Sequence, residues 1–427
     1  MSKTKVAVIG LGYVGLPILA AISKSPKYDA IGYDTLEAKV KNINAGECPI
    51  NDEVCEADMK EFGITATSKI EDIKDANIYV ICVPTPVMSD YTPDYSYVLS
   101  AASSIAPFLE PGNTVILEST VNPGTCEEIL QPKLEELTDL KVGKDITLAH
   151  CPERINPGDP RWTVYNIPRN VGAIPSEKAS KVADFYRDIL EAEVNPVNSI
   201  KVAEATKIVE NTFRDVNIAF VNELAKSFDA MGIDVVETIK GAANKPFGYM
   251  PFWPGRGVGG HCIAVDPYYL IQRAAKSGFN HQFLKIARDI NNSMPSYTVQ
   301  RLQEALNEVK LPINGTKVAL LGMSYKPNVG DLRESPCLEV ATILQDKGAE
   351  LTIFEPYDAK VSNVTTFDEA IKDAQAVIIL TAHDEFKPRL EKILKSPTIK
   401  VVIDGMNKYD KTDFEGTDIV YKGIGKS

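Results

Sequence analysis

The chain opens with a short strand-like segment that passes at once into a glycine-rich turn. Residues 5–9 (KVAVI) are followed by GLGYVG, which places glycines at 10, 12 and 15. In a strand-turn-helix unit of this kind one glycine makes the tight turn, one lets the backbone approach a pyrophosphate, and one lets helix and strand pack closely. The pattern predicts an α/β dinucleotide-binding domain. Its expected cofactor residues are Gly10, Gly12, Tyr13, Val14 and Gly15.

An acidic residue follows the turn at an informative distance. Asp34 lies 19 residues beyond Gly15, close to the ~20-residue offset at which a carboxylate accepts hydrogen bonds from the adenosine ribose. Its charge repels a 2′-phosphate, so the sequence favours NAD over NADP. The alternative is a glycine-rich turn in another kind of α/β protein, and the combination of strand, glycines and acid disfavours it.

Composition sets the class of protein. A chain of 427 residues with 44% hydrophobic and 24% charged residues is typical of globular material with two or three domains. The net charge of -12 disfavours nucleic acid and anionic membranes as partners. Because no window holds the ~18 uninterrupted apolar residues of a membrane span, a cytoplasmic enzyme is expected.

The cysteines and histidines predict thiols and no metal site. The seven cysteines are an odd number and widely scattered, in a chain too large to need disulfides. There is no CxxC pair, and the four histidines are too dispersed for a zinc site.

Buried strands of the first half end in loops that could hold ligands. Strands are expected at 76–83, 114–119 and 146–150. Ligands of open α/β sheets bind at the carboxyl ends of parallel strands. The residues expected on the cofactor side are therefore Pro84, Thr85, Thr120 and Glu153.

A helix is predicted from about 201 to 230. Its apolar positions recur at helical spacing, and Lys207, Asn211 and Arg214 lie on the opposite stripe. A lysine and an asparagine four residues apart could reach one ligand together. Periodicity alone favours the alternative, a solvated face.

The second half of the chain repeats the α/β pattern. A helical region at about 269–306 precedes expected strands at 317–321, 351–354, 376–380 and 401–403. Alternation of strands and helices suggests a second Rossmann-like domain. Its first turn, 322–326, lacks GxGxxG and should bind a nucleotide differently or not at all.

A cysteine follows a run of glycines in the segment GRGVGGHCIAVD, residues 255–266. Nearby backbone amides and steric room suit Cys262 to attack an electrophile, and Asp266 could orient a water or hold a lysine. The alternative is an inert thiol, the more common state of cytosolic cysteines.

Together these motifs resemble the UDP-glucose/GDP-mannose dehydrogenase family along essentially the whole chain. The matching segments are GLGYVG at 10–15, VPTP at 83–86, EST at 118–120, PE at 152–153, the Lys207/Asn211 helix, GGHC at 259–262, and YKPN at 325–328 with RESP at 333–336. The resemblance implies an enzyme that oxidises the C6 alcohol of a nucleotide sugar to a carboxylate with two NAD⁺.

The resemblance also implies roles for individual residues. Lys207 and Asn211 would stabilise the alkoxide-like oxygen, with Asp266 placing a water that takes the proton. Cys262 would form a thiohemiacetal and then a thioester. Hydrolysis would use Glu153, and Thr120 through a water. Further binding residues implied are Gly259 and Lys326 at the sugar and Arg333 at the cofactor.

Two departures from the UDP-glucose pattern point to the substrate. Val265 stands where those enzymes usually have Lys, and Arg154 follows Glu153 where they have Phe. The segment PERINPG, 152–158, resembles the UDP-N-acetylhexosamine branch, with N-acetylglucosamine or N-acetylmannosamine as the sugar. Arg154 could bond an acetamido carbonyl, and it could equally pair with a carboxylate. Arg256 and His261 receive no role.

The resemblance divides the chain into an N-terminal NAD-binding Rossmann domain (1–200), a central helical dimerisation domain that contributes to the catalytic site (201–310) and a C-terminal UDP-sugar-binding Rossmann-like domain (311–427). A homodimer or higher homo-oligomer is expected. The nearest alternative is a UDP-glucose 6-dehydrogenase. A non-catalytic NAD-binding protein is disfavoured, since it needs no nucleophile beside an acid-base set.

Overall fold

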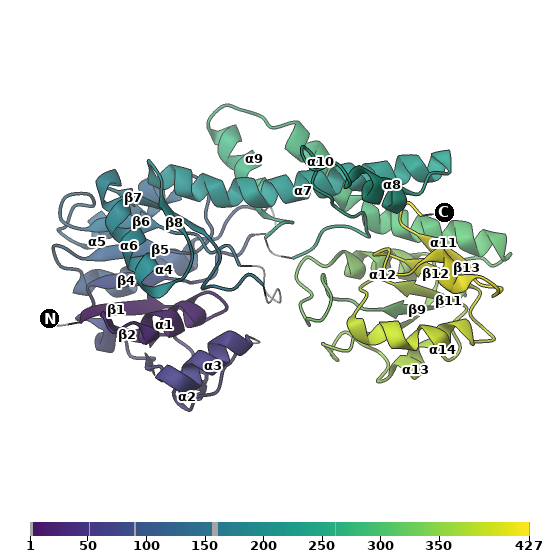
Figure 1. Cartoon of the computed structure of the whole chain (residues 1–427), viewed down its shortest axis with the longest axis horizontal. Coiled ribbons are helices and arrows are strands. Elements are labelled where there is room, and N and C mark those ends of the chain that lie inside the picture. The colour runs from purple at the N-terminus through teal and green to yellow at the C-terminus, as the bar shows by residue number, and fades with distance from the viewer. Residues whose placement is uncertain (1–2, 51, 89–90, 156–160, 261, 427) are drawn as a thin grey trace. The chain divides into compact units, whose positions relative to one another are not determined.

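The computed structural model describes residues 3–50, 52–88, 91–155, 161–260 and 262–426. The chain falls into two compact units, Met1–Glu210 with Tyr268–Ser277, and Asn211–Pro267 with Gly278–Ser427. Figure 1 follows it from the N-terminal sheet through the long helix α7, Ile200–Met231, to the C-terminal sheet. The expected domain boundaries at 200 and 310 remain predictions.

The first unit is built on an eight-stranded sheet with the order β3-β2-β1-β4-β5-β6-β7-β8. Its first six strands have the order of a dinucleotide-binding Rossmann fold. Neighbouring strands are parallel except β6 and β7, which are antiparallel. The strands are β1 Thr4–Ile9, β2 Tyr28–Tyr33, β3 Ala66–Thr67, β4 Ile78–Ile81, β5 Thr114–Leu117, β6 Thr147–His150, β7 Arg169–Ile174 and β8 Val194–Pro196.

Helices cover both faces of this sheet, as the strand sequences require. Val6 and Val8 belong to one buried cluster, whereas Ala7 and Ile9 belong to another. Alternate residues of a strand point to opposite faces, so a strand covered on both sides is apolar throughout. The helices of this unit are α1 Gly15–Lys24, α2 Glu37–Asn44, α3 Glu53–Phe62, α4 Ser96–Ile105, α5 Gln131–Leu137 and α6 Ala179–Ile189, together with most of α9 Asp266–Lys276, which begins in the second unit.

The second unit holds a parallel five-stranded sheet with the order β10-β9-β11-β12-β13, a second doubly wound topology. The strands are β9 Lys317–Leu321, β10 Glu350–Phe354, β11 Ala376–Ile379, β12 Val401–Asp404 and β13 Val420–Gly423. Its other helices are α8 Val235–Ala242, α10 Phe283–Asn292, α11 Met294–Glu308, α12 Pro336–Asp346, α13 Phe367–Ile371 and α14 Leu390–Leu394. The prediction of two Rossmann-like sheets joined by a helical region is confirmed, with the antiparallel β6–β7 pair as the one difference among described strands.

From periodicity alone, the polar stripe of helix α7 was expected to face solvent and its apolar stripe to be buried. The structure shows the opposite. Val209, Phe213 and Phe220 are 56%, 49% and 52% exposed, whereas Lys207 and Asn211 are 9% and 6% exposed. The solvated-face interpretation is therefore wrong for Lys207 and Asn211. A polar pair buried in place of apolar residues needs polar partners, because desolvation is costly. Within the described residues, no helix is both long and apolar enough to cross a membrane.

Candidate active site

The glycine-rich turn after β1 has one side open. Gly10 has φ of 91°, and a Cβ placed on Gly15 would lie 1.9 Å from the Gly10 carbonyl oxygen. A Cβ on Gly12, by contrast, would meet no protein atom within 4 Å. Gly10 and Gly15 are therefore required by the protein's own packing, while Gly12 leaves clear the space in front of the α1 N-terminus. That space and the amides of a helix N-terminus suit a pyrophosphate.

Asp34 is anchored at the end of β2 beside this turn. Its carboxylate accepts hydrogen bonds from the Leu11 amide at 2.9 Å, the Leu36 amide at 3.0 Å and Lys39 Nζ at 2.7 Å. Burial raises the pKa of the Asp34 carboxyl, but these hydrogen bonds outweigh burial and lower it overall. The group is thus a fixed anion at neutral pH, as a ribose acceptor must be.

The loops that follow β4 and β5 are tied together. Thr85 Oγ1 donates to the Thr120 carbonyl at 2.8 Å, and Ser119 Oγ donates to the Val83 carbonyl at 2.6 Å. Tyr269 in α9 donates its hydroxyl to the Thr85 carbonyl at 3.1 Å. The predicted residues Pro84, Thr85 and Thr120 therefore stand in one braced region at the switch point of the sheet.

Glu153 follows β6 and is buried, with both carboxylate oxygens engaged. Oε1 accepts from the amides of Arg154 at 2.6 Å and Ile155 at 2.8 Å, while Oε2 pairs with Arg169. The Arg154 side chain turns to Glu210, which it contacts through Nε at 3.0 Å, and to the Pro168 carbonyl at 2.7 Å. The sequence allowed Arg154 to bind an acetamido carbonyl or a carboxylate. In the structure its guanidinium pairs with the Glu210 carboxylate. Residues 156–158 of the PERINPG segment lie outside the described residues.

In the second unit Asn211 and Asp266 meet directly. Asn211 Nδ2 donates to Asp266 Oδ2 at 2.6 Å, and both side chains are buried. Lys207 lies one helical turn before Asn211 on α7, where positions i and i+4 share a face. Asp266 begins α9, and its amide donates to the Cys262 carbonyl at 2.8 Å. The amide side chain and the carboxylate are therefore held in one fixed arrangement linked to the cysteine loop.

Close packing explains the glycines before Cys262. A Cβ on Gly259 would lie 2.6 Å from the Glu334 carbonyl oxygen, and one on Gly260, where φ is 84°, would lie 2.9 Å from the Tyr325 ring. The Gly260 amide also donates to the Arg333 carbonyl at 3.0 Å. The loop thus lies against the 325 and 333–336 segments. His261 lies outside the described residues.

Cys262 is half-buried and interacts electrostatically with several cationic groups of the same unit. A thiolate at Cys262 would interact favourably with Lys326 and Arg333, and also with Arg214, because each of these cations lies near enough for Cys262 to raise its pKa. Burial lowers the pKa of the Lys326 ammonium, with the Asp331 and Cys262 charges opposing that effect. Positive charge around a thiol favours the thiolate, which is the nucleophilic form.

Arg256, to which the sequence assigned no role, joins two loops of the second unit. The residue is 4% exposed, and its guanidinium donates to the Tyr325 carbonyl at 2.9 Å, the Ser324 carbonyl at 3.3 Å and Thr381 Oγ1 at 2.8 Å. Its amide donates to the Gly405 carbonyl at 3.0 Å. Arg256 therefore fixes the cysteine loop to the turn that carries Lys326.

That turn, 322–326, is itself held by a buried acid and a histidine. Glu355 Oε2 accepts from the amides of Met323 at 2.7 Å and Ser324 at 2.9 Å, and lies 3.1 Å from His383 Nε2. The Asn328 amide donates to His383 Nδ1 at 2.9 Å, so Nδ1 is the unprotonated nitrogen and Nε2 carries the hydrogen that Glu355 accepts. Although burial raises it, these hydrogen bonds lower the pKa of Glu355 to about 2.

Sequence reasoning missed two buried groups of the first unit. Arg169, fully buried, pairs with Glu153. Glu204 accepts from the amides of Gly124 at 2.5 Å and Cys126 at 2.8 Å, and burial raises its pKa to about 7. A signal for Glu204 existed, since it precedes Lys207 by three residues on the stripe that proves buried.

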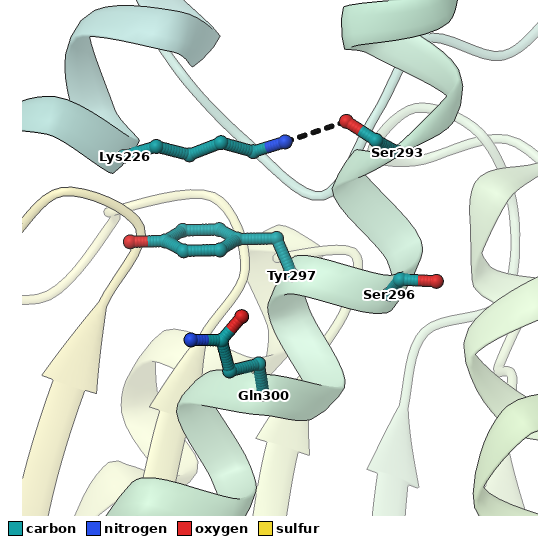
Figure 2. A pocket seen from close by; sticks show the side chains of 5 residues that line it. All are labelled: Lys226, Ser293, Ser296, Tyr297 and Gln300. Atoms are coloured by element: carbon teal, nitrogen blue, oxygen red, sulfur yellow. Dashed lines mark hydrogen bonds between the residues drawn. The ribbon is translucent and has the colours of Figure 1, made fainter.

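A pocket of about 450 Å³ lies elsewhere, lined by α7, α11 and the residue between α10 and α11 (Figure 2). Lys226 donates to Ser293 Oγ there at 2.5 Å. Lys226 is 15 residues from Asn211 along α7, about 22 Å of helix at 1.5 Å per residue. None of the predicted site residues lines this pocket. The described residues contain no group of three His, Cys, Asp or Glu side chains able to hold a metal ion.

Comparison with known proteins covers most of the chain. Three domain models of the UDP-glucose/GDP-mannose dehydrogenase family match it: the NAD binding domain at 4–190, the central domain at 201–293 and the UDP binding domain at 319–411. The chain is 35% identical to a UDP-N-acetyl-D-glucosamine 6-dehydrogenase of Pseudomonas aeruginosa, covering 97% of this chain and 99% of that one. It is 37% identical to a UDP-N-acetyl-D-mannosamine dehydrogenase of Pyrococcus horikoshii, covering 99% of each.

Solved structures agree with this assignment. A UDP-D-ManNAc dehydrogenase from Pyrococcus horikoshii superimposes with a TM-score of 0.91 at 36% identity, covering 99% of both chains. A UDP-glucose dehydrogenase from Pyrobaculum islandicum gives 0.84 at 26% identity, covering 100% of this chain and 98% of that one. Together with the nucleotide turn, Asp34 and the cysteine loop, these matches show that the chain belongs to the UDP-glucose/GDP-mannose dehydrogenase family and is a NAD-dependent nucleotide-sugar dehydrogenase.

Proposed function

We propose that this enzyme oxidises the C6 alcohol of a UDP-N-acetylhexosamine to the uronic acid through a covalent intermediate on Cys262. The observation that carries the proposal is the arrangement of the second unit, where a half-buried cysteine interacts with Lys326 and Arg333 and its loop leads into the Asn211–Asp266 pair. A hydride acceptor is supplied by NAD⁺ when it is bound at the Gly10–Gly15 turn.

The first half-reaction needs stabilisation of the sugar oxygen and a proton acceptor. Lys207 donates to the C6 oxygen as the O–H proton leaves, and the Asn211 amide hydrogen-bonds the same oxygen. Asp266, held by Asn211 at 2.6 Å, orients the water that takes the proton. Loss of hydride from C6 then leaves an aldehyde.

The second half-reaction needs the cysteine. The Cys262 thiolate adds to the aldehyde carbon, and the resulting thiohemiacetal again carries a hydrogen at C6 that leaves as hydride. A thioester remains. Glu153, and Thr120 through a water, activate the water that adds to the thioester carbonyl. The C–S bond then breaks, which releases the uronic acid and the Cys262 thiolate.

The choice of sugar rests on the relatives. Enzymes named for UDP-N-acetyl-D-glucosamine and UDP-N-acetyl-D-mannosamine share 35% and 37% of residues with this chain over nearly its full length. NADH formation measured with UDP-N-acetylglucosamine, UDP-N-acetylmannosamine and UDP-glucose tests the proposal. We expect two NADH per uronic acid with an N-acetylated sugar, and a higher kcat/KM with UDP-glucose than with either would contradict it.

The covalent route is tested at Cys262, with Cys48 as the matched control because it is also half-buried. Cys262→Ala should bind NAD and nucleotide sugar nearly normally and lose sustained turnover, and the C6 aldehyde should not rescue it. Cys48→Ala should retain wild-type turnover. Mass spectrometry of wild-type enzyme quenched during turnover should detect an acyl adduct on Cys262. Uronic acid production by Cys262→Ala at the wild-type rate would refute the mechanism.

We further propose that the enzyme is a homo-oligomer that works in the cytoplasm. Phe213 and Phe220 of α7 are half-exposed on one stripe, and Phe283 and Ile286 of α10 are 67% and 56% exposed, an amount of apolar surface that a second copy would cover. None of the seven cysteines forms a disulfide, in keeping with a reducing compartment. Sedimentation of wild type and Phe220→Glu tests the oligomer, and an unchanged dimer in the variant would place the interface elsewhere.

A further inference from the structure

A buried ionic network surrounds Glu153 in the first unit. Arg169, at the start of β7, is fully buried; Glu118, directly after β5, is 1% exposed. One guanidinium nitrogen of Arg169 donates to Glu118 Oε2 at 3.0 Å, and another donates to Glu153 Oε2. Three neighbouring strand ends thus meet through a single arginine.

The network holds two carboxylates and one cation. Burying such charges is expensive, and an apolar core of the same volume is often as stable or more stable. Tyr186 in α6 adds a hydroxyl that donates to Glu118 Oε1 at 2.6 Å. Burial raises the pKa of Glu118, and the Glu153 charge adds to that effect, whereas Arg169 and Tyr186 oppose it. An arrangement this costly suggests a use beyond stability.

Three further ionisable groups that interact with the network have pKa values raised by burial and are neutral at pH 7. The buried thiols of Cys82, after β4, and Cys151, after β6, both have pKa values raised by burial, that of Cys151 to about 12. Desolvation likewise raises the pKa of the Tyr186 hydroxyl. Among these groups, the charged members of the network are Arg169, Glu118 and Glu153.

The hydrogen bonds fix how Glu153 can turn. Its Oε1 is held by the amides of Arg154 and Ile155, and its Oε2 by Arg169, so rotation of the carboxylate breaks at least one of these contacts. Because Glu118 accepts from the same guanidinium, the hydrogen bonds and the charge of Arg169 are shared between two carboxylates.

We propose that Arg169, Glu118 and Tyr186 are positioning residues for Glu153: Arg169 orients the carboxylate, and Glu118, held by Tyr186, fixes Arg169 and shares its charge with Glu153. The proposal rests on the role proposed above for Glu153 in thioester hydrolysis.

The test is the pH dependence of kcat, measured together with thioester accumulation by quenched mass spectrometry. Glu118→Gln removes one carboxylate, so that Arg169 acts on Glu153 alone. The acid limb of the profile, the fall of kcat toward low pH, should then move to lower pH by about one unit. The thioester should accumulate. Arg169→Met removes the cation, so the limb should move to higher pH, and Arg169→Lys should restore part of the shift. KM for the sugar should stay within about twofold in all three.

Tyr186→Phe changes no charge, so it tests the proposal even if the charge-changing variants fail to fold. Without its donor Glu118 protonates more readily, so the acid limb should move in the direction of Glu118→Gln by a smaller amount. Tyr421→Phe is the matched control, because Tyr421 also donates from a buried hydroxyl to a buried carboxylate, Asp404, at 3.2 Å in the other unit. It should leave the limb in place.

The outcomes separate the proposals. An acid limb that stays in place in Glu118→Gln and Tyr186→Phe overturns the positioning role, whatever their melting temperatures. Wild-type kcat and no added thioester in Glu153→Gln would instead overturn the role of Glu153. Failure of every UDP-sugar to produce NADH with wild-type protein would overturn the proposed function itself.

Discussion

The first turns of the two sheets begin alike and are used differently. In each, the first strand ends at a glycine with positive φ, Gly10 at 91° and Gly322 at 81°. In each, an acid at the end of the adjacent strand accepts hydrogen bonds from amides of that turn: Asp34 in the first sheet and Glu355 in the second. The register supports the equivalence, since Ile9 pairs with Tyr33 as Leu321 pairs with Phe354.

The difference lies in what else each acid holds. Asp34 accepts from one amide of the glycine turn, and one of its other partners is the partly exposed ammonium of Lys39, which a ribose hydroxyl can replace. Glu355 takes two amides of its turn and the ring of His383, all inside the protein. One topology therefore provides a ligand acceptor in the first sheet and a loop anchor in the second.

The largest effect expected from this contrast is on cofactor binding. Asp34→Arg should weaken NAD about 100-fold, because two hydrogen bonds to a charged acceptor are lost, and should improve NADP. Isothermal titration with both cofactors measures this, with Asp29→Arg, an exposed site on the same strand, as the charge control. Unchanged cofactor preference would show that Asp34 does not contact the ribose.

The anchor in the second sheet predicts a loss of stability instead. Glu355 has a folded pKa of about 2 against an ordinary 4.5, so its stabilisation is complete above pH 4.5 and is lost as pH falls from 4.5 to 2. Glu355→Gln should lower the unfolding free energy at pH 7 by roughly 2 to 3 kcal/mol and flatten its dependence on acid pH.

Denaturant unfolding at pH 7 and pH 3 measures this loss, with Glu350→Gln, an exposed position on the same strand, as control. NAD affinity should stay at the wild-type value. If Glu355→Gln weakened NAD as strongly as Asp34→Arg, the two acids would not have separate uses.

A substitution at Gly12 separates two effects of an added methyl group: its effect on NAD binding and its effect on the stability of the protein. Because a Cβ there meets no protein atom within 4 Å, Gly12→Ala should change the unfolding free energy by less than about 0.5 kcal/mol. It should still weaken NAD by about tenfold, since the methyl group takes the space of the pyrophosphate. Gly241→Ala, at another open glycine, should leave NAD binding unchanged. Normal NAD affinity in Gly12→Ala would move the pyrophosphate away from this turn.

Local pattern was sufficient to predict most of the fold. The strand at 317–321 was predicted to the residue, and the helix at 201–230 to within one residue at each end, because long apolar periodicity is a strong signal. Strands β3, β7, β8 and β13 were not predicted, and β3 and β8 have only two and three residues. Their pairing is a property of the whole sheet, so no short window of sequence contains it.

Site residues that belong to a local sequence motif could be predicted. Those whose partners lie far away along the chain could not. Asp34 lies at a recognisable distance from the glycine turn, and Cys262 closely follows a run of glycines. The pairing of Arg169 with Glu118 spans 51 residues, and that of Arg256 with Thr381 spans 125. On α7, periodicity indicated which residues share a stripe, but not which stripe faces the interior, because tertiary packing decides that.

The smallest expected effect concerns Lys39, which distinguishes a replaceable partner of Asp34 from a fixed one. Its side chain is 25% exposed, so the ion pair with Asp34 contributes at most about 1 kcal/mol. Lys39→Met should change NAD affinity by less than about threefold and weaken residual NADP binding, since it removes a cation near the ribose. The matched change in the second sheet, His383→Gln, should lower stability measurably while leaving both cofactor affinities alone. Lys39→Met could instead lose as much NAD affinity as Asp34→Arg. Lys39 would then be a fixed part of its site, as His383 is of the 322–326 turn, and the contrast between the two sheets would fail.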